Sequence, residues 1–566
     1  MNENILLDIQ KTLSIPLKSI TTVLELLEEG NTIPFIARYR KEATGGLDEE
    51  QINEIYKTWE YQNNLLKRKE DVIRLIDEKG MLTEDLKQEI LKAQKLVEVE
   101  DLYRPFKEKK KTKATEAIAK GLEPLANWLM MFTHEDVLKE AKKFVKEDVP
   151  TPEEAIEGAK YIIAEMVSDD ANYRKALRQE MVSHGMVMTS IKKNAVDEKK
   201  TYEMYYDYQE AVNKIRPHRI LAINRAENEK VITVKIETDR ERMISYLERK
   251  IVKRDQSPSS VFIKEAIDDA LKRLIYPSLE REVRAELTEK GEEQAIEIFS
   301  VNLQKLLLQP PMKGKVVLGI DPAFRTGCKL SVVNEQGTVL EKGVIYPHEK
   351  TLGGKITDEQ IIESQRKLLL LIKKHKVEII AIGNGTASRE TEAFVADLIK
   401  TTGMKVQFVI VSEAGASVYS ASELAREEFP DFSVEERSAA SIARRLQDPL
   451  SELVKIDPKS IGVGQYQHDV TPKKLNDQLN FVVTQAVNQV GVNVNTASKA
   501  LLMYVSGLNK STAENIVKFR DQAGKFIRRE DLMKVPKLGG KTYEQAIGFL
   551  RIPDGDEALD MTAVHP

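Results

Sequence analysis

Apolar residues recur at helical spacing through most of the first 310 residues. The clearest example spans residues 17–29, and Gly30 follows it as a C-terminal cap. The apolar face of this predicted helix consists of Leu17, Ile20, Val23, Leu24 and Leu27. Further helix starts are marked by Asp48 with Gln51, and by Thr151 before Pro152 and Glu154. The pattern therefore predicts a helical N-terminal scaffold over residues 1–313, with a long helical stretch over 259–309 that is broken near Pro277.

Between these helices the stretch NTIPFIARYRKEATGGLDEEQI predicts a short basic helix, a glycine turn and a new helix. Its cations are Arg38, Arg40 and Lys41. A helix, a turn and a short basic helix resemble a helix-turn-helix that would contact nucleic acid. A plain corner of a helical bundle gives the same pattern, so both interpretations remain open here.

The pattern changes from helical to strand-like spacing at Gly314. Apolar runs typical of strands cover residues 316–320, 329–333 and 339–346, and a helix is predicted over 357–375. A strand at 377–383, a helix at 388–400 and a strand at 405–411 follow. Three hairpin-connected strands followed by alternating helices and strands are the order of a ribonuclease-H-like α/β fold. We therefore predict such a domain over residues 314–450.

Two similar segments near the end of the chain predict a repeated motif. LLMYVSGLNKSTAENIVKFR and EDLMKVPKLGGKTYEQAIGFL each contain the end of a helix, a tight glycine turn and a new helix. We interpret residues 495–557 as tandem helix-hairpin-helix motifs, joined to the α/β domain by a helical segment over 451–494. Capping boxes are predicted at Ser511 with Glu514 and at Thr542 with Gln545.

Such hairpins direct backbone N–H groups and a helix N-terminus toward one point, which suits a phosphate. The predicted contacts are Gly507, Leu508, Lys510, Gly539 and Lys541, with Arg528 and Arg529 nearby. Two contacts for each hairpin predict a log–log salt slope of about −3 to −4 on duplex DNA. A helical linker with incidental charge is the alternative interpretation.

Charge is distributed unevenly along the 566 residues. The chain carries a net charge of −4, whereas residues 495–552 hold seven lysines and four arginines against five acidic residues. That segment therefore has a charge of +6 and the remainder −10, which is typical of a local nucleic-acid contact surface on an acidic body. Residues 104–113 carry six cations and one acid; this run is either a phosphate contact or a solvated face.

The remaining composition restricts the functional class. One cysteine, Cys328, excludes internal disulfides and favours a reducing compartment. One cysteine and seven scattered histidines argue against a structural zinc site, and we expect no cofactor or metal. No apolar run reaches the roughly 18 residues of a membrane span, and the N-terminus lacks the features of a signal peptide. We therefore expect a cytoplasmic monomer with no membrane partner.

The α/β domain raises the question of nuclease chemistry. Cleavage by two metal ions needs several carboxylates around cations about 4 Å apart. Asp321 ends the first predicted strand, Glu413 follows the last, and Asp448 follows the helix after it. The fourth strand ends in Gly383, Asn384 and Gly385, without an acid. These three carboxylates are at most a vestigial catalytic set, and Asp321 is also suited to capping a turn.

Together these motifs resemble the bacterial transcription accessory protein family Tex over essentially the whole chain. Five segments carry this resemblance and together are very specific: NTIPFIARYRKEATGGLDEEQI, LYRPFKEKKKTKATEAIAKGLEPLA, GIDPAFRTGCKLSVV, ERSAASIARRLQDPLSELVKIDPKSIGVGQYQHDV and VSGLNKSTAENIV. The resemblance implies a multidomain, mainly α, elongated scaffold with one YqgF (RNase-H-like) domain, tandem helix-hairpin-helix motifs and nucleic-acid binding in transcription. It also implies kinship with a eukaryotic elongation factor, and a YqgF domain without nuclease activity.

One departure from the family concerns the end of the chain. Tex proteins continue into an OB-fold RNA-binding domain, whereas we interpret residues 558–566 as the start of a linker to that domain. Asn509 also stands where the first hairpin more usually has glycine. We therefore expect a non-catalytic, sequence-non-specific scaffold for RNA or DNA. The alternatives are a metal-dependent nuclease or junction resolvase, and a scaffold that docks on RNA polymerase or the ribosome.

Overall fold

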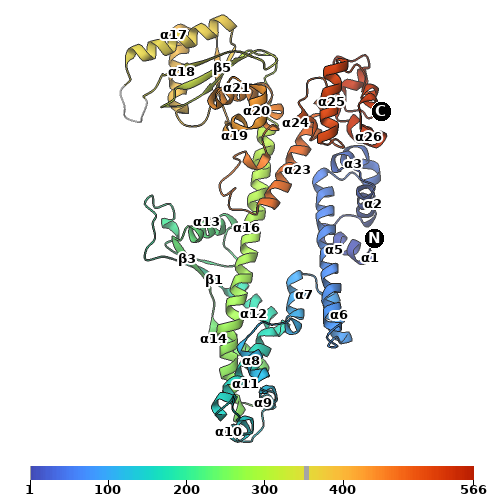
Figure 1. The fold of residues 1–566 in the computed structure, drawn as a ribbon, viewed down its shortest axis with the longest axis vertical. Helices are drawn as coiled ribbons and strands as arrows, with labels where there is room; N and C mark the ends of the chain where they lie inside the picture. Colours follow the sequence, from blue (N-terminus) through green and yellow to red (C-terminus); the bar gives the residue numbers. More distant parts are fainter. Residues whose placement is uncertain (1, 350–355) are drawn as a thin grey trace. The chain divides into compact units, whose positions relative to one another are not determined.

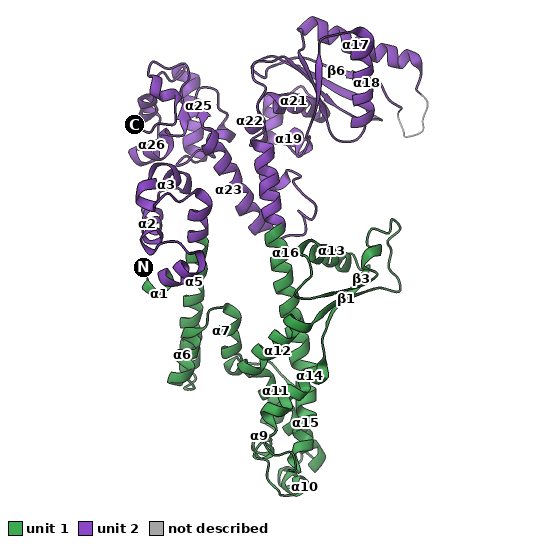
Figure 2. Ribbon diagram, turned by 180° about the vertical axis from the view of Figure 1, so that it is seen from behind, with its two compact units in different colours: residues 1–5, 57–294 green, residues 6–56, 295–566 purple. Residues whose placement is uncertain are grey.

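The computed structural model describes residues 2–349 and 356–566 and confirms a multidomain, mainly helical protein with one α/β domain (Figure 1). The chain divides into two compact units (Figure 2). Unit 1 is formed mainly by residues 57–294, and unit 2 by residues 6–56 with 295–566. Residues 6–56 and 295–313 of the predicted scaffold over 1–313 thus lie in unit 2 and the rest mainly in unit 1.

Unit 1 consists mostly of short helices. Helix α5 (Glu49–Asp77) begins in unit 2 and ends in unit 1. The helices that follow it in unit 1 are α6 (Glu84–Lys92), α7 (Leu96–Tyr103), α8 (Lys113–Ala119), α9 (Glu123–Leu129), α10 (Val137–Ala141), α11 (Pro152–Asp169), α12 (Ala171–His184), α13 (Pro217–Asn228), α14 (Arg240–Ile251) and α15 (Ser259–Asp269). As predicted, Thr151 caps α11, because its hydroxyl accepts the Glu154 N–H at 3.2 Å.

A small antiparallel sheet in unit 1 was not predicted. Strand β1 (Met186–Ile191) lies between β2 (Asp207–Ala211) and β3 (Ile232–Glu237). In β3 the sequence ITVKIE alternates between buried and more exposed positions, which is the period-2 signal of a half-buried strand. The surrounding helical pattern concealed this signal.

The predicted break near Pro277 is a local change of helix type. Residues Ala270–Ile275 form a π-helical turn between α15 and α16 (Tyr276–Leu307). Proline lacks an N–H and its ring clashes with the carbonyl four residues earlier in a regular helix. The wider turn just before Pro277 accommodates the ring, so the helix continues instead of ending.

The α/β domain of unit 2 has the predicted strand order. Its sheet is arranged β6-β5-β4-β7-β8, with β4, β5 and β6 antiparallel and β4, β7 and β8 parallel. The strands are β4 (Val317–Asp321), β5 (Cys328–Val333), β6 (Val339–Ile345), β7 (Ile379–Gly383) and β8 (Gln407–Val411). This topology confirms the ribonuclease-H-like fold.

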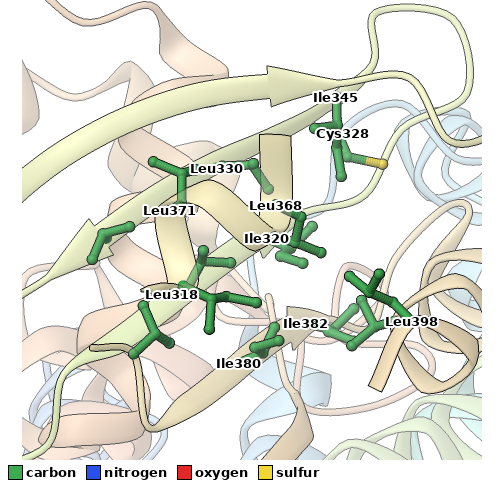
Figure 3. Close-up of a cluster of buried hydrophobic side chains, with 14 of the residues drawn as sticks. Leu318, Ile320, Cys328, Leu330, Ile345, Leu368, Leu371, Ile380, Ile382 and Leu398 are labelled. Atoms are coloured by element: carbon green, nitrogen blue, oxygen red, sulfur yellow. The ribbon is translucent and has the colours of Figure 1, made fainter. Parts of the chain in front are cut away.

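Helices cover both faces of this sheet. Helices α17 (Asp358–His375) and α18 (Ser388–Thr402) contribute Leu368, Leu371 and Leu398 to the cluster of Leu318, Ile320, Ile380 and Ile382 on one face (Figure 3). Helix α21 (Val434–Gln447) packs on the other face. It approaches β4 closely at Gly319, where an added Cβ would lie 2.2 Å from the Ala439 carbonyl oxygen. Glycine therefore allows this helix to contact the strand directly.

The rest of unit 2 is helical apart from a two-residue parallel pair, β9 (Val492–Asn493) with β10 (Leu550–Arg551). Its N-terminal helices are α1 (Glu3–Leu13), which begins in unit 1, α2 (Leu17–Glu28), α3 (Ile33–Tyr39) and α4 (Lys41–Thr44). Its later helices are α19 (Ala416–Ala421), α20 (Glu423–Glu428), α22 (Pro449–Leu453), α23 (Pro472–Val490), α24 (Lys499–Leu502), α25 (Lys510–Ala523) and α26 (Gly540–Ile547). None of the helices among the described residues combines the length and apolarity of a membrane span.

Candidate nucleic-acid interface and carboxylate site

The two hairpin turns have the same backbone plan. Gly507 in the first turn has φ of 79°, and Lys537 takes the equivalent place in the second with φ of 66°. The next residue of each turn is a buried leucine whose N–H donates to a valine two residues before the left-handed position. Leu508 N–H donates to Val505 at 3.0 Å, and Leu538 N–H to Val535 at 3.2 Å. Helices α25 and α26 begin directly after these turns.

The helix starts differ from the predicted capping boxes. Helix α25 is capped by Asn509, whose side chain accepts the Thr512 N–H at 3.0 Å, and not by Ser511 with Glu514. Asparagine thus serves as the N-cap in place of the expected glycine. Helix α26 begins after Gly539 without a side-chain cap, so the predicted pair of Thr542 and Gln545 is also wrong. Glu514 and Gln545 instead bind other side chains and other segments.

The first hairpin turn is enclosed by three other segments. A Cβ added to Gly507 would lie 2.5 Å from Cβ of Gln545 on α26. Ser506 donates its N–H to Asn488 of α23 at 2.9 Å, and its hydroxyl contacts the hydroxyl of Thr32. Other protein segments therefore fill the space beside this turn, where the sequence predicts a phosphate.

Gln545 joins this turn to the N-terminal helices. Its side-chain oxygen accepts the Thr32 N–H at 3.0 Å, and its amide donates to Asn31 at 2.7 Å. Lys541 makes a related contact, because its ammonium donates to the carbonyl of Glu29 after α2. A cation at a helix C-terminus satisfies an unpaired carbonyl and the helix dipole. Lys541, predicted as a phosphate contact, thus has a partner within unit 2 although its side chain is exposed.

The second hairpin turn is open. Cβ atoms added to Gly539 and Gly540 would meet nothing within 4 Å. Among the described residues, no partner is found for the N–H groups of Gly540, Lys541 and Thr542 at the start of α26, and Tyr543 is the first whose N–H is bonded, to the Gly539 carbonyl at 2.9 Å. Lys537 is exposed and lies 3.5 Å from the Ser511 hydroxyl, next to exposed Lys510 at the start of α25. The open turn and the start of α25 therefore form one cationic surface, which we term the hairpin-2 surface: Lys510, Ser511 and residues 536–541.

The two predicted arginines have different environments. Arg528 is exposed, whereas Arg529 is 2% exposed and donates to the carbonyls of Leu550, Thr562 and Val564. Burial lowers the pKa of Arg529. Arg529 therefore holds the C-terminal residues onto the hairpin region and is not available to a phosphate. His565 also donates a hydrogen bond to the Glu544 carbonyl at 2.8 Å, so part of residues 558–566, predicted as the start of a linker, contacts the hairpin region.

The helix-turn-helix interpretation of the N-terminal segment is not supported. Helix α3 buries Pro34, Phe35, Ile36 and Ala37, and the Tyr39 ring packs on Phe549 with centroids 5.3 Å apart. Arg40 forms an ion pair with Glu544 at 2.9 Å. The face that would enter a groove is therefore packed against the hairpin region, as expected for a corner of a bundle.

The basic run at 104–113 is largely engaged in unit 1. Arg104 and Lys109 pair with Asp169, and Lys107 pairs with Glu100 at 2.5 Å. Lys113 lies 4.5 Å from the centroid of the Tyr161 ring. These contacts favour the solvated-face interpretation over a phosphate site.

The carboxylates of the α/β domain come together only in part. Asp321 lies at the end of β4, close to Glu413. The negative charge of Glu413 raises the pKa of Asp321. A Cβ added to Gly383 would lie 2.6 Å from the Glu413 carboxylate and 3.2 Å from Pro322, which follows Asp321. Burial is the main cause that raises the pKa of Asp321 to about 6, opposed by a hydrogen bond from Ser438 and reinforced by Glu413.

Asp448, the third candidate carboxylate, does not join this pair. Helix α21 runs antiparallel to β4: Ser438 contacts Asp321, whereas Gln447 donates to Lys315 at 2.8 Å. Nine residues of helix separate those contacts by about 14 Å. Asp448 caps α22 and pairs with Lys313 at 3.4 Å, at the far end of β4.

The carboxylate missed by sequence analysis is Glu435, in the first turn of α21, whose charge also raises the pKa of Asp321. Glu435 and Asp448 stand at opposite ends of α21. The direction of α21 across β4 decides which of them lies near Asp321, and the sequence pattern does not specify that direction. Within residues 2–349 and 356–566, no three His, Cys, Asp or Glu side chains are grouped closely enough to hold a metal ion.

The fold and these sites define a multidomain protein that combines an RNase-H-like domain with tandem helix-hairpin-helix motifs. Family models match four regions: "Tex-like protein N-terminal domain" at 3–77, "Tex central region-like" at 133–299, "Tex protein YqgF-like domain" at 315–447 and "Helix-hairpin-helix motif" at 487–551. The chain belongs to the Tex family.

Several curated relatives support this assignment over the full length of the chain. The chain is 56% identical to the uncharacterized protein YdcI of Bacillus subtilis, covering 99% of this chain and 77% of that protein. It is 42% identical to the transcriptional accessory protein Tex of Neisseria gonorrhoeae, over 100% of this chain and 74% of that protein. It is 36% identical to the human S1 RNA-binding domain-containing protein 1, over 94% of this chain and 54% of that protein.

Gln545→Ala should loosen the N-terminal helices from the hairpin region. It leaves the Thr32 N–H and the Asn31 side chain without their partner, at a cost of about 2 kcal/mol. Hydrogen exchange of the amides of residues 31–33 should speed up by more than tenfold, whereas exposed Gln522→Ala on α25 should change nothing. Equal exchange in both variants would show that Gln545 does not hold this contact.

Asp321→Asn should stabilise the α/β domain above pH 6. A carboxyl whose pKa rises from 3.8 to about 6 on folding binds more protons when folded, so stability falls as pH rises between about 4 and 6. The neutral amide removes the free-energy cost of ionising this carboxyl in the folded protein, which is at most about 2–3 kcal/mol. Thermal unfolding from pH 4 to 8 should show a raised Tm near pH 7 and a flatter profile.

The matched control is Asp397→Asn, which changes an exposed carboxylate on α18 of the same domain. It should keep the wild-type pH profile. A lower Tm for Asp321→Asn at pH 7 would instead mean that the ionised carboxylate stabilises the fold.

Proposed function

We propose that this protein is a non-catalytic scaffold that binds RNA or DNA without sequence preference and acts in transcription in the cytoplasm. The hairpin-2 surface carries the proposal, because it combines unpaired N–H groups at a helix start with two exposed lysines. Phosphate oxygens accept such N–H groups, and the helix dipole favours their negative charge. The +6 charge of residues 495–552 provides a wider attractive field.

The relatives support the same class of function. One is named a transcriptional accessory protein and another an S1 RNA-binding domain-containing protein. Contacts to the phosphate backbone carry no sequence information, so the hairpins alone would bind many sequences equally. Since the first turn is enclosed, only the second turn and the start of α25 remain as contacts. The expected salt slope is accordingly about −2, not −3 to −4.

The test is a double charge reversal, Lys510→Glu with Lys537→Glu. It should lower affinity for single-stranded and duplex RNA and DNA alike, by at least tenfold at low salt, and flatten the salt slope by about 2. Fluorescence anisotropy titrations at several salt concentrations would measure both effects. The matched control is Lys518→Glu with Lys525→Glu, which makes the same change in net charge farther along α25 and just after its end.

The control should lose much less affinity, because both of its lysines lie away from the start of α25 by about 12 Å or more. Equal losses in the two double variants would mean that only net charge matters. Unchanged binding in the hairpin variant would place the contact elsewhere in the chain.

Nuclease activity is the second candidate, favoured by the raised pKa of Asp321 next to Glu413. The non-catalytic proposal is supported by the short ligand set, since Asp448 lies at the other end of β4. Two-metal cleavage needs more hard oxygen ligands than Asp321 and Glu413 supply, and Glu435, the third carboxylate near them, is not grouped with them closely enough to hold a metal ion.

Incubation of end-labelled RNA and DNA, single-stranded and duplex, with the protein and Mg²⁺ or Mn²⁺ should give no product above the level seen with Asp321→Asn. Cleavage by the wild-type chain that disappears in this variant would establish the nuclease instead.

A further inference from the structure

Among residues 2–349 and 356–566, no strand pairs with the outer edge of β8 in the five-stranded sheet. Strand β8 is the last strand in the order β6-β5-β4-β7-β8. Gln407 N–H donates to Glu378 at 3.3 Å, and Val411 accepts the Asn384 N–H at 3.1 Å. The odd-numbered residues therefore bond to β7, and the N–H and C=O groups of Phe408 and Ile410 point toward the open edge.

This edge lacks the features that usually protect a sheet from pairing. Residues 407–411 contain neither charge nor proline, and Val409 and Ile410 are 36% and 39% exposed. The opposite edge is protected in the usual manner: β6 carries Glu341 and Lys342, and its register with β5 shifts at an irregularity. The difference between the two edges indicates that β8 is a contact surface.

We propose that β8 pairs antiparallel with β8 of a second copy of this chain, about a two-fold axis at Val409. This register places Phe408 opposite Ile410 of the partner copy, so the outward N–H and C=O groups of both strands bond to each other. It is the register in which all five residues of each strand overlap. The pairing would join the two sheets into one continuous sheet.

Side chains are complementary in the same register. Val409 lies beside its own copy, and Gln407 faces Val411 of the partner copy. Each exposed apolar side chain of the edge thereby gains an apolar neighbour, which is the main stabilising unit of antiparallel pairs. Beyond the strand ends, Lys405 and Glu413 come opposite each other in sequence, but the Glu413 carboxylate lies over Gly383 and Gly385 and does not face the open edge. No like charges face each other within the strands.

A second copy fits this edge better than an unrelated extended peptide. An identical strand supplies apolar residues and hydrogen-bonding groups at matching positions, and a two-fold axis repeats each contact. The interface is short, so we expect a weak dimer with a Kd on the order of 10 µM, in place of the monomer expected from the sequence.

Sedimentation velocity of the full chain should show a monomer–dimer equilibrium in this concentration range. Val409→Lys places two lysines side by side at the two-fold axis and should leave only monomer at every concentration. Val418→Lys is the control, because it adds the same charge at an exposed valine of α19 and should leave the dimer unchanged. A monomer at all concentrations, or a dimer insensitive to Val409→Lys, would overturn the proposal.

Cysteine cross-linking tests the register independently of affinity. The pair at the axis is non-hydrogen-bonded, with Cα atoms about 4.5 Å apart, which a disulfide can span. Val409→Cys should therefore form a disulfide-linked dimer under mild oxidation. Gln407→Cys on the same strand and face should not, because each copy would sit opposite Val411. The native Cys328 is buried and does not interfere.

Cross-linking at equal rates by the two cysteine variants, or by neither, would contradict the antiparallel register centred on Val409.

Discussion

The contact of Gln545 with the N-terminal helices determines which hairpin turn can serve as a nucleic-acid interface. Buried backbone groups must be paired, and Gln545 supplies the partner for the Thr32 N–H while its Cβ fills the space beside Gly507. The Lys541 ammonium then donates to the Glu29 carbonyl, which the end of α2 leaves without a helical partner. Because these groups are used inside the protein, the first turn is enclosed. The second turn, which makes no such contacts at Gly539 and Gly540, stays open.

Much of the fold could be predicted from local patterns. The strand order of the α/β domain follows from apolar runs and their spacing, and single helix starts such as Thr151 follow from capping chemistry. The small sheet of unit 1 was missed because its strands are short and lie among strongly helical segments. The assignment of residues 6–56 to unit 2 was also missed, since no local pattern reveals a contact across 500 residues of sequence.

The site residues were predicted less well than the fold. Lysines and glycines of a hairpin identify the motif, but only tertiary packing shows that Lys541 and Arg529 are engaged within the protein. Lys537 was overlooked because lysine is uncommon at a left-handed position. Similarly, Asp448 and Glu435 occupy opposite ends of α21, and the direction of that helix decides which carboxylate lies near Asp321.

The most direct measurement is hydrogen–deuterium exchange of the whole chain with and without a single-stranded or duplex RNA or DNA. The account predicts protection on binding at Lys510, Ser511 and residues 537–541 of the hairpin-2 surface, with residues 31–33 and 505–508 protected equally in both states. Protection confined to residues 104–113, or to the carboxylate pair of Asp321 and Glu413, would contradict it.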